Sequence, residues 1–332
     1  MRLLGDSWYA AELGIRTIED EPLPRWVARR LHNPFVRGLA LWWRGRRYDR
    51  VVLSDGGVAF RTVMLLERLR PRHRRYLVLL EFRPVPRRPR AYRWRSRIRL
   101  LLRAGYQTWI VGPVLRSALA RAHTLSSWEV ERNAAVFGVS PERFVFVPFP
   151  MTAAGDELPP LEGRGRRVLA SGRTLCDWPL VFAAADGQPW DLEIVCAEGE
   201  RSLVDRLNAG AGARVRCDIP LQAHWALLHE VAVYLLPLRE AQVSSGHIRI
   251  FDATRGGAPL VAADVRGVAD YVSHEETALL FPPGDALAAR EAVNRLLNDR
   301  ELADQLRRTA FEFGQQRTRD EYLNRIRALI HG

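Results

Sequence analysis

Residues 244–264 read SSGHIRIFDATRGGAPLVAAD, and their order of turn, helix and strand decides how the rest of the chain is interpreted. The stretch opens with a turn signal at 244–246, has a helix-like run at 247–255, breaks at two glycines, and ends in an apolar strand at 258–263. A glycine-containing turn that opens a helix presents backbone N–H groups and the positive end of the helix dipole, which together form a phosphate site. A serine before a helix is also a common N-cap, so these residues alone leave both interpretations open.

The flanking segments repeat the alternation of strands and helices. Further strands are predicted at short apolar runs, namely residues 167–171, 192–197, 213–219 and 231–237. Helices are predicted at residues 178–185, 221–230 and 285–331. Strands that alternate with helices favour a parallel sheet covered on both faces.

The first half of the chain has the same alternation with weaker signals. Candidate strands lie at residues 13–21, 47–57, 75–82, 108–112 and 123–127. Only MRLLGD precedes a helix-like stretch at the start, so we expect the first strand there to be very short or missing, and this domain to be shortened.

A segment rich in proline, glycine and acidic residues follows residue 148 and separates the two halves. We therefore predict the α/β class, with two Rossmann-like doubly wound domains facing a cleft. The predicted division is an N-terminal domain at 1–150, a linker at 151–165, and a C-terminal domain at 166–332 that ends in helices.

Composition limits the chemistry and the compartment. The 332 residues are 47% hydrophobic and 27% charged, carry a net charge of +12 and contain no lysine. Any phosphate must therefore be held by arginine, backbone N–H groups or helix N-termini. Three cysteines without a CxxC pair indicate a reducing compartment and thiols that are buried or neutral. With no signal-peptide pattern and no apolar run of membrane-spanning length, we expect a cytoplasmic protein.

Several motifs occur in an order that carries a family resemblance. They are ASGR at 170–173 followed by DW at 177–178, YLLP at 234–237, the stretch from residue 244, and PPGD at 282–285 before a long helix. This order resembles the nucleotide-binding C-terminal domain of GT-B glycosyltransferases, and most closely the large retaining family 4 (glycosyl transferases group 1). The resemblance covers about residues 127–332.

The resemblance implies a function. A sugar would move from a nucleotide-diphosphate-sugar donor, such as a UDP- or GDP-sugar, to a glycan, lipid-linked or small-molecule acceptor held against the N-terminal domain. Stereochemistry would be retained, and neither a metal nor another cofactor would be needed. The acceptor is expected to be an envelope glycan or lipid.

The resemblance also implies site residues. Arg173 would neutralise the donor diphosphate, and Asp252 would hold the ribose hydroxyls, so these two are the predicted catalytic residues. The predicted donor-binding residues are Ser244, Ser245, Gly246, His247, Ile248, Arg249 and Gly257. Arg249 is equally compatible with an exposed position on a helix.

The chain also departs from the family pattern. The family's first glutamate falls on Ser244, and its lysine falls at Cys176 and Asp177, where Asp177 is interpreted as a helix cap. The N-domain histidine has no certain counterpart, and the nearby Asp55 and Glu81 are interpreted as loop or capping carboxylates. These departures leave an alternative, a catalytically degenerate binding protein with the same fold.

Two segments of the N-terminal half are basic and aromatic, at residues 25–47 and 83–103. A run of charge is usually a solvated face, but arginine interleaved with tryptophan and leucine also suits an anionic membrane surface. We therefore expect peripheral attachment to the inner face of the membrane as a partner interaction. Nucleic acid is disfavoured because helix-turn-helix, RNP and zinc signatures are missing from the sequence.

Overall fold

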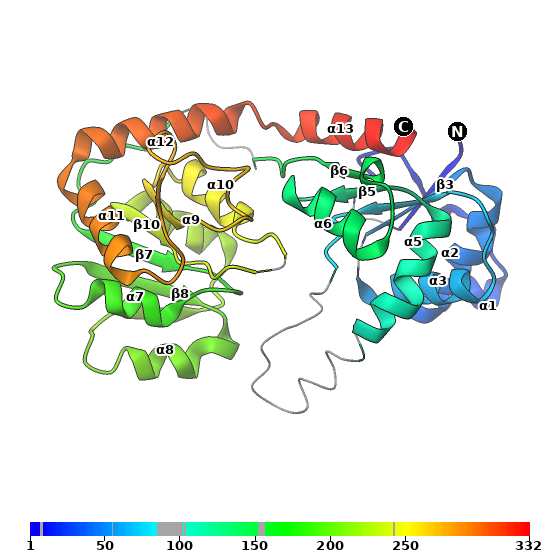
Figure 1. The fold of residues 1–332 in the computed structure, drawn as a ribbon, viewed down its shortest axis with the longest axis horizontal. Coiled ribbons are helices and arrows are strands. Elements are labelled where there is room, and N and C mark those ends of the chain that lie inside the picture. The colour runs from blue at the N-terminus through cyan, green and yellow to red at the C-terminus, as the bar shows by residue number, and fades with distance from the viewer. Residues whose placement is uncertain (7–8, 55, 85–101, 103, 152–156, 242) are drawn as a thin grey trace. The chain divides into compact units, whose positions relative to one another are not determined.

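The computed structural model describes residues 1–332 with the exception of 7–8, 55, 85–101, 103, 152–156 and 242. The chain forms two compact units (Figure 1). Unit 1 contains Met1–Val147 and Tyr322–Gly332, and unit 2 contains Pro148–Glu321. Each unit has a six-stranded sheet whose neighbouring strands are parallel. The predicted fold class, α/β with two Rossmann-like domains, is therefore confirmed.

Unit 2 arranges its strands in the order β12-β11-β10-β7-β8-β9. The strands are β7 (Arg167–Ser171), β8 (Asp191–Cys196), β9 (Arg214–Cys217), β10 (Val233–Leu236), β11 (Leu260–Ala263) and β12 (Leu279–Phe281). From β7 the chain moves outward through β8 to β9, and it then returns to the other side of β7 as β10. The direction of winding therefore reverses between β7 and β10.

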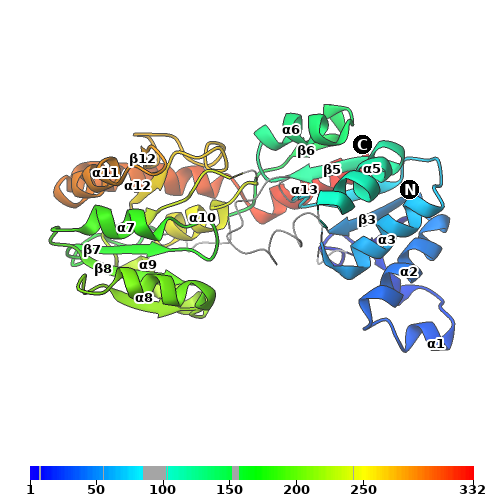
Figure 2. The same ribbon diagram turned by 60° about the horizontal axis from the view of Figure 1, so that its bottom comes forward.

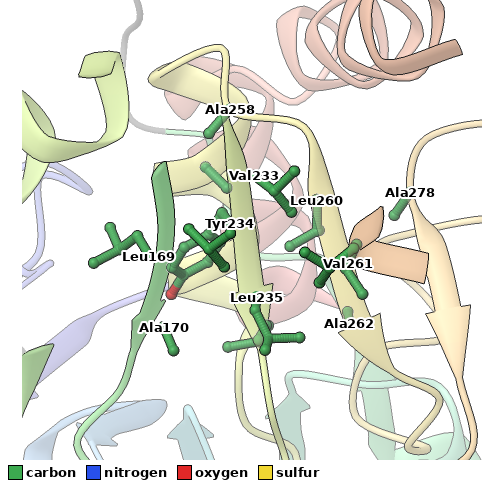
Figure 3. Close-up of a cluster of buried hydrophobic side chains, with 14 of the residues drawn as sticks. Leu169, Ala170, Val233, Tyr234, Leu235, Ala258, Leu260, Val261, Ala262 and Ala278 are labelled. Atoms are coloured by element: carbon green, nitrogen blue, oxygen red, sulfur yellow. The ribbon is translucent and has the colours of Figure 1, made fainter. Parts of the chain in front are cut away.

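The core of unit 2 lies along these strands. Figure 3 shows Leu169 on β7, Val233, Tyr234 and Leu235 on β10, and Val261 on β11. Every residue of β10 and β11 is buried. Burial along a whole strand is typical of parallel sheets covered on both faces, and it explains why these strands are continuous apolar runs in the sequence.

The helices of unit 2 lie on both sides of its sheet, with α7 and α11 on one side and α9 and α10 on the other (Figure 2). Their bounds are α7 (Trp178–Ala185), α8 (Arg201–Leu207), α9 (Leu221–Glu230), α10 (His247–Arg255), α11 (Ala286–Asn298) and α12 (Arg300–Gln315). Asp177, Asp285 and Asp299 cap α7, α11 and α12, each accepting a hydrogen bond from the N–H three residues later. The interpretation of Asp177 as a cap is confirmed.

Unit 1 arranges its strands in the order β2-β1-β3-β4-β5-β6. They are β1 (Leu3–Asp6), β2 (Arg16–Thr17), β3 (Arg50–Ser54), β4 (Leu77–Leu80), β5 (Leu119–Thr124) and β6 (Phe144–Phe146). The helical elements are η1 (Ile18–Asp20), α1 (Arg25–Ala28), α2 (Pro34–Arg44), η2 (Gly45–Arg47), α3 (Gly57–Leu69), η3 (Gln107–Val111), α5 (Gly112–Ala118), α6 (Trp128–Phe137), η4 (Pro141–Arg143) and α13 (Arg319–His331). The first strand is therefore present and short, four residues long.

Successive residues of the unit 1 strands face opposite sides of the sheet. On β3, Val51 and Leu53 join the core beneath α2, α3 and α5. Val52 between them points to the other side, where it packs with Tyr322 and Ile326 of α13. Because side chains alternate between the two faces of the sheet, one strand contributes to two hydrophobic cores.

The predicted strand at 108–112 is wrong, because these residues form η3, a π-helical turn that continues into α5. Its β-branched and aromatic composition favours a strand. However, Val111, Val114, Leu115 and Ala118 are all buried, and their spacing of three and four residues places them on one helical face. The packing of that face decides the local structure.

The compact units differ from the predicted division at the C-terminus. The prediction placed all of 166–332 in the C-terminal domain, whereas residues 322–332 belong to unit 1. The reason is burial, because Leu323, Ile326, Leu329 and Ile330 of α13 pack on the sheet of unit 1. The predicted linker is only partly described, since residues 152–156 lie outside the described residues.

Candidate functional site

The candidate site lies in unit 2 where the winding reverses, at the carboxyl ends of β7 and β10. Doubly wound sheets bind ligands at this point because the loops from the two strands diverge there. The loop after β7 covers residues 172–177, and the loop after β10 covers residues 237–246. Backbone hydrogen bonds tie the two loops together, with the Arg239 N–H donating to the Leu175 carbonyl at 2.8 Å and the Asp177 N–H to the Pro237 carbonyl at 2.7 Å.

Two glycines allow these loops to turn sharply. A Cβ at Gly172 would lie 2.2 Å from Cys176 Sγ. Gly246 has a φ of +95°, and a Cβ there would lie 2.5 Å from Leu238 Cδ1. A larger residue at either position would therefore force the loop to move, and at Gly246 it would also be strained by the backbone angle.

Gly246 is the N-cap residue of α10, so the Ser-Ser-Gly turn directly precedes the helix. The intrahelical bonds begin with the Ile250 N–H, which donates to the Gly246 carbonyl at 2.9 Å. The N–H groups of the first turn precede that bond and point out of the helix end, as in any α-helix. The helix dipole adds positive potential at the same place. This end of α10 has the features of an anion site.

The loop after β11 packs against the Ser-Ser-Gly turn. A Cβ at Gly267 would lie 2.9 Å from the Ser245 nitrogen and 3.1 Å from Ser244 Cα, so the two loops are in close contact. Arg266 Nε also donates to Glu240 Oε1 at 3.0 Å and links the same two loops. The turn is therefore held in place before any ligand arrives.

Arg173 lies on the loop after β7, beside this helix end in the topology of the sheet. Its side chain is 62% exposed, and its guanidinium is 3.4 Å from Asp218 Oδ1. An ion pair at that exposure contributes little free energy, so the guanidinium is able to exchange Asp218 for a stronger anion.

The side chains at the start of α10 have different environments. His247 packs against Tyr271 and Phe149, with ring centroids 5.7 and 5.3 Å away. Ile248 is exposed. His247 thus offers the site its backbone N–H, while its ring belongs to an aromatic cluster.

Arg249 and Asp252 of α10 are held in a buried polar cluster. Arg249 Nη1 donates to Asp252 Oδ2 at 3.1 Å, and Trp225 Nε1 of α9 donates to Asp252 Oδ1 at 2.9 Å. Burial raises the pKa of Asp252, against the opposing effects of these two donors. Arg249 therefore has a fixed partner and is not a freely solvated helix residue.

The structure places Gly257 away from the other predicted donor-binding residues. It follows the C-terminal end of α10, and its φ of +59° is typical of the residue that ends a helix. Its carbonyl accepts from Arg164 Nη1 at 2.9 Å. Because a nine-residue helix is about 13 Å long, Gly257 lies far from Gly246.

Comparisons with known proteins agree with this architecture. Residues 174–299 match the model of the family described as glycosyl transferases group 1. No curated protein matches the chain by sequence. Among solved structures, the chain resembles HepE from Anabaena in complex with UDP and glucose, with 15% identity, 98% of this chain and 90% of that chain covered, and a TM-score of 0.66.

Two further structures extend the comparison. A mutant of TarM from S. aureus, in complex with fondaparinux, alpha-GlcNAc-glycerol and UDP, has 11% identity and a TM-score of 0.64. The match covers 89% of this chain and 59% of the TarM chain, so this chain spans less than two thirds of TarM. WaaG, a glycosyltransferase involved in lipopolysaccharide biosynthesis, has 14% identity, coverage of 94% and 97%, and a TM-score of 0.59. The chain has the GT-B fold, and its similarity to group 1 glycosyltransferases lies in residues 174–299.

This GT-B protein has a buried polar network next to the candidate site that the sequence motifs do not indicate. His224 of α9 is bonded through Nε2 to Ser171 Oγ at 2.7 Å, and Ser171 Oγ is 2.8 Å from the Tyr234 hydroxyl. Arg249 Nη1 lies 3.1 Å from His224 Nδ1. Arg249 Nη1 is also 3.3 Å from His224 Nε2, so the tautomer of the neutral ring decides which nitrogen accepts from the guanidinium.

His224 is neutral for a physical reason. Burial, reinforced by the charge of Arg249, lowers its pKa to about 3. A signal for this residue exists in the sequence, because His224 stands three and four residues before the buried Leu227 and Leu228 on one face of α9. A polar residue on an apolar helix face requires a partner, but the sequence does not identify Ser171 as that partner.

In unit 1, the carboxylate Glu81 follows β4 at the carboxyl edge of the sheet. It has a φ of +50°, uncommon for a residue with a side chain, and it accepts a hydrogen bond from the Tyr9 hydroxyl at 2.9 Å. Its N–H donates to His123 Nδ1 at 3.3 Å. The other carboxylate considered from the sequence, Asp55, lies outside the described residues.

Two negative findings apply to the part of the chain that the structure describes. No cluster of three or more His, Cys, Asp or Glu side chains is arranged to hold a metal ion. None of the helices there is long and apolar enough to cross a membrane.

Proposed function

We propose that this GT-B protein transfers a sugar from a nucleotide-diphosphate-sugar donor to an acceptor, with retention of stereochemistry and without a metal ion. The main observation in support is the position of the N-terminus of α10, which follows a Ser-Ser-Gly turn at the point where the winding of unit 2 reverses. The donor diphosphate binds the N–H groups of that helix end, together with the hydroxyls of Ser244 and Ser245. Close approach is possible because Gly246 has no side chain.

Arginine supplies the positive charge in this proposal. Arg173 leaves Asp218 and pairs with the diphosphate, stabilising the charge that develops as the sugar departs. Arg249 adds a second cation whose position is fixed by Asp252 and His224. Preorganised donors of this kind act without reorganisation during the reaction, and together with the helix end they take the place that a metal would occupy.

The assignment of Asp252 to the ribose hydroxyls stays a prediction. Both of its oxygens accept hydrogen bonds within the protein, and its side chain is 6% exposed. A carboxylate has about four acceptor positions, so a ribose hydroxyl can still be added. The contacts support a role in holding Arg249 in place.

The proposed acceptor is an envelope glycan or lipid-linked saccharide, held by unit 1. WaaG acts in lipopolysaccharide biosynthesis, and the TarM structure contains a glyceryl glycoside with UDP. The basic character of unit 1 is in keeping with an acceptor that lies among anionic lipids or phosphate-containing polymers.

The face of unit 1 formed by α1 and α2 supports attachment to the inner face of an anionic membrane. Phe35, Leu39 and Trp43 are exposed at a spacing of four residues along α2, so they form one stripe, and Trp26 of α1 is 61% exposed. Residues 25–47 contain seven arginines and no acidic residue. Apolar side chains beside exposed arginines are the combination that inserts at a lipid interface.

The second basic segment considered from the sequence, residues 83–103, lies almost entirely outside the described residues, which exclude 85–101 and 103. The membrane proposal therefore depends on residues 25–47. We expect the triple variant Trp26→Ala, Phe35→Ala, Trp43→Ala to bind anionic vesicles about tenfold more weakly than the native chain, since each substitution removes an aromatic insertion. Leu287→Ala, which trims an exposed leucine of α11, is the control. Equal sedimentation of the native protein with neutral and anionic vesicles at low salt would contradict the attachment.

Calorimetry with UDP, GDP, ADP and their sugar conjugates tests the donor site. We expect one nucleotide to bind, and Arg173→Ala to weaken that binding roughly 10- to 150-fold, which corresponds to a charged hydrogen bond of about 1.5–3 kcal/mol. Arg167→Ala is a matched control, because Arg167 is also exposed and ion-paired but lies at the other end of β7. Binding by none of the nucleotides would overturn the proposal. Nucleotide binding without turnover of any sugar donor would favour the degenerate binding protein.

A further inference from the structure

Two of the three cysteines are adjacent in the sheet of unit 2. Cys196 is the last residue of β8 and Cys217 the last residue of β9, and the strand register pairs them directly. Their Sγ atoms are 3.3 Å apart, and both thiols are free. The third cysteine, Cys176, lies on the loop after β7, with its sulfur 3.7 Å from the Thr174 carbonyl.

We propose that Cys196 and Cys217 are a reversible thiol–disulfide site that reacts with low-molecular-weight disulfides such as oxidised glutathione. Neighbouring strands are about 4.8 Å apart, which is within the Cα separation that a disulfide spans. The sulfurs must approach each other by only a little over 1 Å to reach the bond length of about 2.05 Å. The assignment depends on the two thiols alone and is independent of the proposed sugar transfer.

The position of the pair makes the bond reversible and not purely structural. Side chains that stand opposite each other on parallel strands keep their Cβ atoms near the strand spacing, whereas a relaxed disulfide brings them to about 3.8 Å. The oxidised pair is therefore strained. Strained disulfides are the ones that cellular thiols reduce readily.

The surroundings provide access for the oxidant. Cys217 is half-buried and Cys196 is buried, so Cys217 is the sulfur that meets a reagent from solvent. The guanidinium of Arg201 interacts electrostatically with the Cys217 thiol. Oxidised glutathione carries several carboxylates, so a fixed positive charge next to the attacking sulfur favours its approach.

The reaction balances with one oxidant molecule. The Cys217 thiol gives up its proton to solvent, and its sulfur attacks one sulfur of oxidised glutathione, which releases one glutathione thiolate. Cys196 then loses its proton and attacks Cys217 Sγ in the mixed disulfide, which releases the second glutathione. One S–S bond is formed and one is broken. The protein loses two electrons and two protons, and glutathione gains them.

The test incubates the full chain in buffers of graded oxidised-to-reduced glutathione ratio, blocks the remaining thiols with an alkylating reagent, and maps the peptides by mass spectrometry. We expect Cys196 and Cys217 to become protected together as one cross-linked peptide pair, and reduced glutathione to reverse this. Cys176→Ser should leave the transition unchanged. Cys217→Ser should abolish it, and Cys196→Ala should leave glutathione attached to Cys217. The proposal is overturned if the native chain, even in the most oxidising buffer, accumulates a glutathione adduct on Cys217 without the cross-link, or keeps both thiols open to alkylation.

Discussion

Replacement of His224 by glutamine tests the buried network next to the proposed donor site. In the folded chain the ring is 1% exposed, and its nitrogens lie within hydrogen-bonding distance of Ser171 Oγ and of the Arg249 guanidinium. Glutamine also offers one acceptor and one donor on a planar group, so His224→Gln retains both kinds of bond. It removes the imidazole, whose ordinary pKa lies between pH 5 and 8.

The size of the effect follows from the difference in pKa. Burial and the charge of Arg249 lower the pKa of His224 from 6.5 to about 3 in the folded state, whereas the unfolded chain has the ordinary value. Below pH 6.5 His224 binds a proton in the unfolded state but not in the folded state. Its contribution to the free energy of unfolding is therefore complete above pH 6.5 and is lost as the pH falls. At 1.36 kcal/mol per pH unit, the loss at pH 5 is about 2 kcal/mol relative to pH 8.

The readout must isolate unit 2, because His123 in unit 1 has a pKa lowered by burial to about 4 and adds a slope of the same sign. Amide hydrogen exchange of peptides from β7 and β10 reports the opening of unit 2. We expect the native chain to lose about 2 kcal/mol of protection between pH 8 and pH 5 after correction for intrinsic exchange. His224→Gln should lose much less, and His32→Gln, an exposed histidine, should behave like the native chain. Asp252, whose pKa is raised by burial, is present in every variant and cancels in the comparison. If His224→Gln keeps the native pH dependence, the buried histidine is not its source.

Three further outcomes are expected. Arg164→Met should destabilise unit 2 by about 2–4 kcal/mol in urea unfolding, because charged hydrogen bonds are worth about 1.5–3 kcal/mol each. The buried guanidinium of Arg164 donates to the carbonyl of Pro160 at 2.8 Å and to that of Gly257 at 2.9 Å. The control is Arg300→Met, which removes an exposed ion pair and should change the stability by less than about 1 kcal/mol. Gly246→Ala should weaken nucleotide binding by about tenfold, since its φ of +95° and the contact with Leu238 displace the turn, whereas Gly284→Ala has a φ of +86° with open space around it and should leave the affinity unchanged in calorimetry. Oxidation of Cys196 and Cys217 should alter nucleotide affinity about fivefold or more, because the next residue, Asp218, is the partner of Arg173; equal affinity of oxidised and reduced protein would separate the thiol site from donor binding.

The strands of unit 2 could be predicted from the sequence because parallel strands buried on both faces are continuous apolar runs. The predicted runs at 167–171 and 231–237 contain β7 and β10, and a predicted helix at 178–185 coincides with α7. At 108–112 the composition favours a strand, but the buried face of a helix decides the structure. The packing of residues 322–332 on unit 1 could not be predicted, since the sequence of an amphipathic helix does not specify which sheet its apolar face will cover.

In the candidate site, the backbone features could be predicted from the sequence, whereas the side-chain partners could not. The turn at 244–246 could be predicted because a turn between a strand and a helix has a recognisable composition, and its position at the reversal point follows from strand order. The roles of Gly257 and His224 depend on partners far away along the chain. Gly257 accepts from Arg164, 93 residues away, and His224 is bonded to Ser171, 53 residues away.

The surroundings of Arg249 bear on the departures from the family pattern. The chain lacks the family's lysine and first glutamate, but it contains Asp252, Trp225 and His224 around the guanidinium of Arg249. A buried carboxylate with two donors, and a histidine kept neutral by burial, cost stability unless they hold something in place. Here they hold a cation in the first turn of α10, at the helix end to which the diphosphate is proposed to bind. A cation fixed in that position is of use to any chain that binds a nucleotide diphosphate. The buried network therefore supports donor binding, which the transferase and the degenerate binding protein share.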